Sequence, residues 1–152
     1  MSKKFSAYTL IEMLVVIAII SVVAIFILPV SINELQKSRL DSTVSDIASE
    51  LYQFQQNAYA RRNNKSYGVA FNQPQQKYTF FIGNSLASAE ETSEKILDSK
   101  INITQINLSG GATEIVFNAG SFKPSAFGNV FFNDGINSFR LVINSEGLID
   151  YY

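Results

Sequence analysis

Apolar side chains form one long run near the start of the chain. From residue 10 to residue 28, only Glu12 and Ser21 interrupt the run, and Pro29 follows it. A helix over these 19 residues would be roughly 28 Å long, about the thickness of the hydrocarbon core of a bilayer. The pattern therefore predicts a membrane-spanning helix within residues 8–30.

The helical pattern continues beyond this run with a different distribution of apolar residues. Steps of three and four place a set of apolar side chains on one face of a helix, and polar side chains occupy the other face. We therefore expect an amphipathic continuation over residues 31–64 that packs on a sheet, with Arg61 and Arg62 in its last turn. The apolar set is Leu40, Val44, Ile47, Leu51, Phe54 and Ala58.

After Lys65 the pattern changes to short runs rich in β-branched and aromatic residues, separated by Gly, Asn, Asp and Pro. These runs predict a β domain over residues 65–152, with about seven or eight short antiparallel strands. A helix followed by such strands favours an α+β fold in which the helix lies across the sheet. The polar stretch 85–95 is expected to be a loop or a short helix. The predicted strands are 67–71, 78–82, 100–108 with a bulge, 114–117, 129–132, 139–143 and 148–152.

The composition excludes several kinds of chemistry. The chain has 152 residues with no Cys, His or Trp, so it has no disulfide, no usual zinc or copper site and no Ser-His or Cys-His nucleophile. We expect no cofactor, no metal and no enzymatic activity. The net charge is −1 and the basic residues are dispersed, which argues against a nucleic-acid surface.

Three polar residues near the end of the chain could be considered calcium ligands. Asp134, Asn137 and Glu146 carry the oxygen atoms that calcium prefers, but they lack the spacing of an EF-hand loop. Asn, Asp and Gly are also the residues that turns require. We therefore interpret these three residues as parts of hairpin turns.

Glu12 is the residue that a plain membrane anchor does not explain. A carboxylate in a spanning helix costs ~2.5–3.5 kcal/mol at the bilayer centre, and such residues are usually functional or paired. Lys3 and Lys4 place the N-terminus in the cytoplasm, and no small-residue cleavage site follows the apolar run. A partner for Glu12 must come from another chain or from a new terminus, and cleavage between Ala7 and Tyr8 would create such a terminus.

At these residues the sequence resembles a known family. A short basic leader, then Ala7, residues 8–12 and an apolar helix resemble the class III signal of type IV prepilins and pseudopilins. The resemblance implies that prepilin peptidase cuts the Ala7–Tyr8 bond and N-methylates Tyr8. It also implies that Glu12 guides filament assembly by pairing with a neighbour's amine, and that Pro29 kinks the helix. The family usually has Gly where this chain has Ala7.

Within the family, the sequence is most similar to the H-type minor pseudopilins. Residues 51–63, 68–71 and 139–149 carry this resemblance. It implies a leader at 1–7, a single-pass inner-membrane protein with a cytoplasmic N-terminus, and a β domain on the periplasmic or extracellular side. The implied partners are prepilin peptidase, an inner-membrane assembly platform and other pilins or pseudopilins. The implied function is that of a structural subunit of a type II secretion pseudopilus or a type IV pilus, and the alternative is a membrane-anchored minor pilin for adhesion or DNA uptake.

Overall fold

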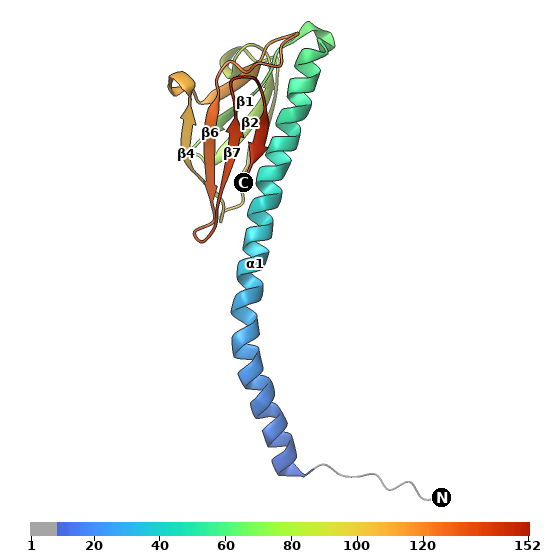
Figure 1. Ribbon diagram of the computed structural model, residues 1–152, viewed down its shortest axis with the longest axis vertical. Helices are drawn as coiled ribbons and strands as arrows, with labels where there is room; N and C mark the ends of the chain where they lie inside the picture. Colours follow the sequence, from blue (N-terminus) through green and yellow to red (C-terminus); the bar gives the residue numbers. More distant parts are fainter. Residues whose placement is uncertain (1–8) are drawn as a thin grey trace, which may run out of the picture. The chain divides into compact units, whose positions relative to one another are not determined.

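A computed structural model describes residues 9–152, except for the side chains of residues 25–32 within the first helix. The chain divides into two units, Met1–Gln36 and Lys37–Tyr152 (Figure 1). Ala7 and Tyr8 lie outside the described residues, as does the side chain of Pro29. The cleavage site, the methylation site and the kink therefore stay predictions.

The first element is the helix α1, Leu10–Tyr59. In the second unit, five of the six predicted core positions on this helix are buried and Phe54 packs against them, which confirms the predicted apolar face. The prediction that Arg61 and Arg62 lie in the last turn is wrong. Arg61 adopts a left-handed backbone conformation with φ 52°, which ends the helix. Arg62 instead begins the short 3₁₀ turn η1, Arg62–Asn64.

Eight antiparallel strands follow in two four-stranded sheets, where a single sheet was predicted. The first sheet has the order β3-β2-β1-β5 and the second β4-β6-β7-β8. The first contains β1 (Tyr67–Asn72), β2 (Lys77–Ile82), β3 (Glu91–Ile96) and β5 (Glu114–Phe117). The second contains β4 (Asn102–Leu108), β6 (Gly128–Asn133), β7 (Ser138–Ile143) and β8 (Ile149–Tyr151). Two short 3₁₀ turns, η2 (Leu86–Ser88) and η3 (Ser109–Gly111), complete the described elements.

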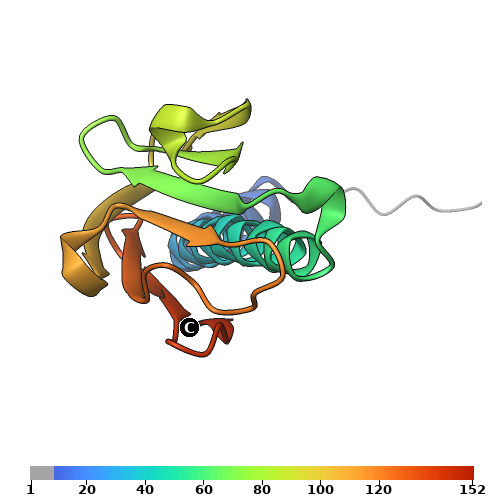
Figure 2. The ribbon, with the colours of Figure 1, turned by 90° about the horizontal axis from the view of Figure 1, so that it is seen from above.

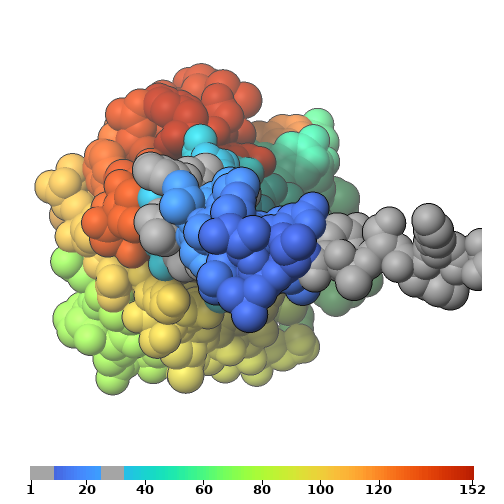
Figure 3. All heavy atoms as spheres, turned by 90° about the horizontal axis from the view of Figure 1, so that it is seen from below, coloured from blue at the N-terminus to red at the C-terminus, as the bar shows by residue number. Residues whose placement is uncertain are grey.

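The core of the second unit lies between its helical segment and the two sheets. Figure 2 shows this segment of α1 end-on, with β1 on one side and the later strands on the other. Phe54 of α1 contacts the rings of Tyr67 and Phe80 from the first sheet. Tyr151 of the second sheet donates a hydrogen bond to Ser45 of α1 at 3.0 Å. In Figure 3, the strands β2 (light green) and β8 (red) lie on opposite sides of this unit. This segment of α1 therefore packs against both sheets and covers their shared core.

The strand β3 corrects the prediction of a loop or short helix at residues 85–95. All six of its residues are exposed, so neither face shows the apolar alternation by which strands are recognised. Its lysine and glutamate side chains suit an edge strand, because charges oppose pairing with another chain. The ion pair Lys77–Glu94 ties β3 to β2 at 2.7 Å, and Lys95–Glu50 ties β3 to α1. The bulge predicted in the strand at 100–108 is confirmed by a register shift in β4.

Candidate functional site

The first turn of α1 is organised around Thr9 and Glu12. Oγ1 of Thr9 accepts a hydrogen bond from the backbone N–H of Glu12 at 3.3 Å, and the Thr9 carbonyl accepts one from Met13 at 3.2 Å. Thr9 is thus the N-cap, and Thr-x-x-Glu is the sequence of a capping box. Glu12 lies exposed in the turn where free N–H groups favour negative charge. The local fold therefore presents a carboxylate at the start of the apolar helix.

The helix after Glu12 exposes apolar side chains on every side. Eleven large ones between Leu10 and Val23 are each 46–78% exposed in the structure. Successive residues of a helix point in directions about 100° apart, so consecutive apolar residues cover its whole circumference. A helix that is apolar all round is stable only in an apolar environment, either lipid or the interior of an assembly.

The hydroxyl of Ser21, the polar residue within this stretch, needs no water molecule as a hydrogen-bond acceptor. Its hydroxyl donates a hydrogen bond to the carbonyl of Ile17 at 2.8 Å, within the same helix. Such a bond removes much of the cost of placing a hydroxyl in an apolar environment. Ser21 is therefore compatible with lipid and with packing against another apolar helix.

Among the described residues, no helix combines the length and the apolar character needed to cross a membrane.

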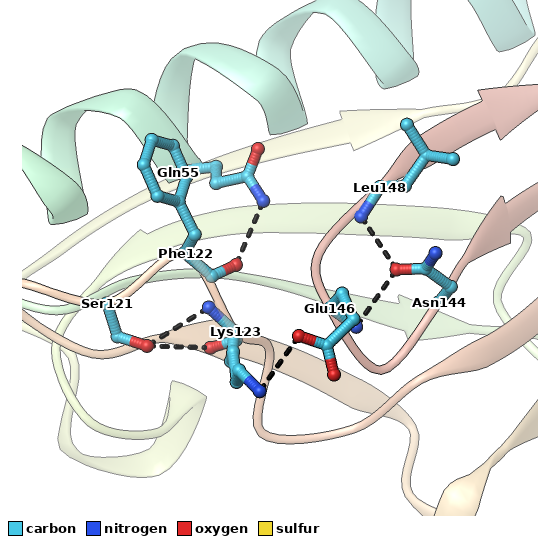
Figure 4. Close-up of polar contacts among 7 residues, drawn as sticks. All are labelled: Gln55, Ser121, Phe122, Lys123, Asn144, Glu146 and Leu148. Atoms are coloured by element: carbon cyan, nitrogen blue, oxygen red, sulfur yellow. Dashed lines mark hydrogen bonds and ion pairs between the residues drawn. The ribbon is translucent and has the colours of Figure 1, made fainter.

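A second organised region, which the sequence did not reveal, surrounds the buried side chain of Gln55. Its Nε2 donates hydrogen bonds to the carbonyl of Phe122 at 2.9 Å and to the carbonyl of Gly147 at 2.6 Å. These carbonyls belong to the loop before β6 and to the turn between β7 and β8, as Figure 4 shows for Phe122 and the turn residues. Gln55 thus joins α1 to two segments far apart in the sequence. We call this arrangement the Gln55 clamp.

Neighbouring contacts support the Gln55 clamp. The ring of Tyr59 stacks on Phe122 with centroids 3.8 Å apart. The side chain of Asn144 accepts hydrogen bonds from the backbone of Glu146 and Leu148 at 3.0 and 2.8 Å, and so shapes the turn (Figure 4). Gly147 in that turn has φ +91°, a conformation that favours glycine. The exposed ion pair Lys123–Glu146 links the two segments at 2.8 Å.

The residues considered as calcium ligands lie in two different turns. Asp134 accepts hydrogen bonds from the backbone of Ile136 and Asn137 and from the Asn137 side chain, between β6 and β7. Burial alone would raise the pKa of Asp134, but these hydrogen bonds outweigh it and hold its pKa below the ordinary value. Glu146 instead pairs with Lys123. The predicted turn chemistry is confirmed, and the described residues contain no group of three or more Asp or Glu side chains placed to hold a metal.

Comparison with known proteins bears on both units. Residues 2–28 match the family described as the prokaryotic N-terminal methylation motif. The structure is similar to the type IV minor pilin FimU of Pseudomonas aeruginosa strain PAO1, with a TM-score of 0.54 and 10% identity over 76% of this chain and 90% of that one. The fold of this chain is pilin-like. No curated protein matches the sequence of the pilin-like chain.

A second structure gives the same fold. The minor pseudopilin EpsH from the type 2 secretion system of Vibrio cholerae has a TM-score of 0.55 to the pilin-like chain, at 11% identity over 75% of this chain and 96% of that one. The predicted α+β pilin fold and the resemblance to minor pilins and pseudopilins are confirmed. The two proteins that share the fold are named a minor pilin and a minor pseudopilin, and neither name is that of an enzyme. The motif also implies processing by prepilin peptidase and anchoring through the N-terminal segment.

Proposed function

We propose that the chain is a structural subunit that waits in the bacterial inner membrane and is assembled into a type II secretion pseudopilus or a type IV pilus. The observation that carries this proposal is the helix that is apolar on all sides and begins with the capped turn at Glu12. Lipid accommodates this surface before assembly. Neighbouring helices in the centre of a filament replace the lipid afterwards.

Processing would prepare the start of this helix. Prepilin peptidase removes residues 1–7 and N-methylates Tyr8, which leaves a positively charged amine one residue before the N-cap Thr9. Glu12 then pairs with the Tyr8 amine of a neighbouring subunit and sets the register between the two helices. In an apolar interior such a pair stabilises only when both charges are present, because an unpaired charge is costly.

The β domain would face outward on the far side of the membrane and contact other subunits or cargo. Four of its lysines are already paired with glutamates, which reduces the positive charge that it offers to phosphates. This observation supports a contact with proteins over one with nucleic acid. The pairs are Lys65–Glu90, Lys77–Glu94, Lys95–Glu50 and Lys123–Glu146.

The N-terminus of the mature protein tests the proposal. We expect mass spectrometry of the protein from its own host to show a chain that begins with N-methylated Tyr8. Expression in a strain that lacks prepilin peptidase is the control and should give the full-length chain. Replacement of Ala7 by Gly keeps the site small and should leave the same mature terminus. An unprocessed N-terminus in the presence of the peptidase would contradict the proposal and favour a plain membrane anchor.

A further inference from the structure

The outer strands of the two sheets are β3, β5, β4 and β8, and the first three have covered or charged edges. The edge of β5 is bonded to the loop that contains Pro124 and Ser125. The side-chain amides of Gln73 and Gln76 bond to the backbone along the edge of β4. The edge of β3 carries charged lysine and glutamate side chains. Such devices prevent an edge from pairing with another chain.

The edge of β8 has no such cover along most of its length. Arg140 of β7 and Tyr152 exchange two backbone hydrogen bonds, at 2.8 and 3.1 Å. Bonded and non-bonded pairs alternate in an antiparallel ladder, so Ile149 and Tyr151 direct their backbone groups away from β7. The Tyr151 N–H donates to Oδ1 of Asp150 at 2.8 Å. Within the described part of the chain, the N–H and C=O of Ile149 and the C=O of Tyr151 have no backbone partner.

A groove of about 350 Å³ lies between this edge and α1, and we call it the β8 groove. Ala48 and Ser49 of α1 are small and leave space beside the strand, and the half-exposed ring of Tyr52 also lines the groove. The hydroxyl of Tyr151 donates to Ser45 at 3.0 Å and holds β8 against the helix. The β8 groove therefore lies where one more strand of the second sheet would lie.

Asp150 adds a charge requirement at the β8 groove. Its side chain is exposed and makes no ion pair with any described residue. Arg140 lies over the ring of Tyr152, 4.3 Å from its centroid, and so does not neutralise this carboxylate. A strand that covered Asp150 without an opposite charge would remove water from the carboxylate at a cost. A lysine or arginine on the strand, directly opposite Asp150, would stabilise the pairing instead.

We propose that the β8 groove binds an extended segment of a partner protein, which joins the second sheet as a fifth strand and carries a lysine or arginine opposite Asp150. In this mode of recognition, backbone hydrogen bonds give affinity and alternate side chains give specificity. The side chains on the inner face would contact Ala48 and Tyr52. A helical partner could not use the free groups of Ile149, because the backbone groups of a helix are bonded internally. The inference does not depend on the role of the chain in a filament.

The test uses the full chain in detergent, with isotope-labelled backbone amides, and three short blocked peptides as probes. The peptides alternate valine and threonine, which favours an extended strand. The first has a central lysine, the second has a central glutamate, and the third is the lysine peptide with its backbone nitrogens methylated. We expect the lysine peptide to give saturable amide shifts at Ile149 and Tyr151 in nuclear magnetic resonance and to slow hydrogen exchange of the Ile149 N–H. The amide of Thr104 on β4 should not respond.

Asp150→Asn tests the charge requirement. Asparagine keeps the oxygen that accepts the Tyr151 N–H and removes only the charge. The original chain should bind the lysine peptide about fivefold more tightly than the glutamate peptide, and the variant should bind the two about equally. Asp98→Asn is the matched control, because Asp98 is another exposed aspartate whose oxygen accepts a backbone N–H, that of Lys100. It should keep the preference for lysine.

Four results would overturn the proposal. The first is the absence of a saturable shift with the lysine peptide. The second is equal affinity for the methylated peptide, which cannot pair as a strand. The third is an undiminished preference for lysine in Asp150→Asn. The fourth is protection of the Ile149 N–H that rises with protein concentration in the absence of peptide, which would assign the β8 groove to a second copy of the chain.

Discussion

Replacing Glu12 by Gln is expected to prevent incorporation into the filament while the protein still enters the membrane and folds. Glutamine suits the same capping box, so the first turn of α1 keeps its local structure. The change removes only the negative charge and leaves the neighbour's Tyr8 amine without a partner. Breaking a buried pair costs ~3–5 kcal/mol, which corresponds to a loss of roughly a hundredfold or more in association.

The measurement is the amount of the variant in the sheared filament fraction, compared with its amount in the membrane fraction. Glu34→Gln is the matched control, because Glu34 is an exposed glutamate of the same helix, outside its first turn. It should be incorporated like the original chain. Normal incorporation of the Glu12 variant would refute a register charge at this position, whatever the control shows.

The second large effect is expected at the Gln55 clamp. Gln55→Leu keeps a side chain of similar size but removes the donor to the Phe122 and Gly147 carbonyls. Leaving a buried acceptor unpaired costs ~1–3 kcal/mol. The bond to Gly147 is buried and the bond to Phe122 is partly buried, so the loss of both costs ~2–5 kcal/mol, somewhat less than two fully buried acceptors would. For a domain of about this size the loss corresponds to a fall of roughly 8–20 °C in melting temperature.

Thermal unfolding followed by circular dichroism of the β signal measures this change. Gln53→Leu, an exposed position two residues earlier on α1, is the control and should shift stability by no more than ~0.5 kcal/mol. If the two variants melted at the same temperature, the Gln55 clamp would contribute nothing to stability. In that case, the stack of Tyr59 on Phe122 would be the contact to test next.

The Gln55 clamp shows which contacts of α1 can be predicted from the sequence and which cannot. Leu51, Phe54 and Ala58 follow helical spacing, and their burial or packing in the core was predicted. Gln55 lies at the same spacing, so a polar residue on an apolar face was the available signal. Its partners are backbone carbonyls about 67 and 92 residues away, and no local pattern identifies those.

The sequence did not predict three other features of the fold, and the physical reasons are similar. An edge strand with both faces exposed, as in β3, has no apolar alternation to detect. The end of α1 at Tyr59 depends on the backbone of Arg61 and on the Gly120 N–H, which donates to the Ala58 carbonyl at 2.7 Å from a distant loop. The division of the strands into two sheets is likewise a tertiary property, since hairpin turns fix only neighbouring pairs.

The most direct test of the proposed assembly is a photo-crosslink from the apolar helix. A benzoylphenylalanine residue placed at Ile17, which is 58% exposed, would report what covers this surface in the cell. We expect crosslinks to the apolar N-terminal helix of other pilin-like subunits, and we expect Glu12→Gln in the same chain to abolish them. Crosslinks to lipid alone, in cells that assemble the filament, would contradict a role as a filament subunit.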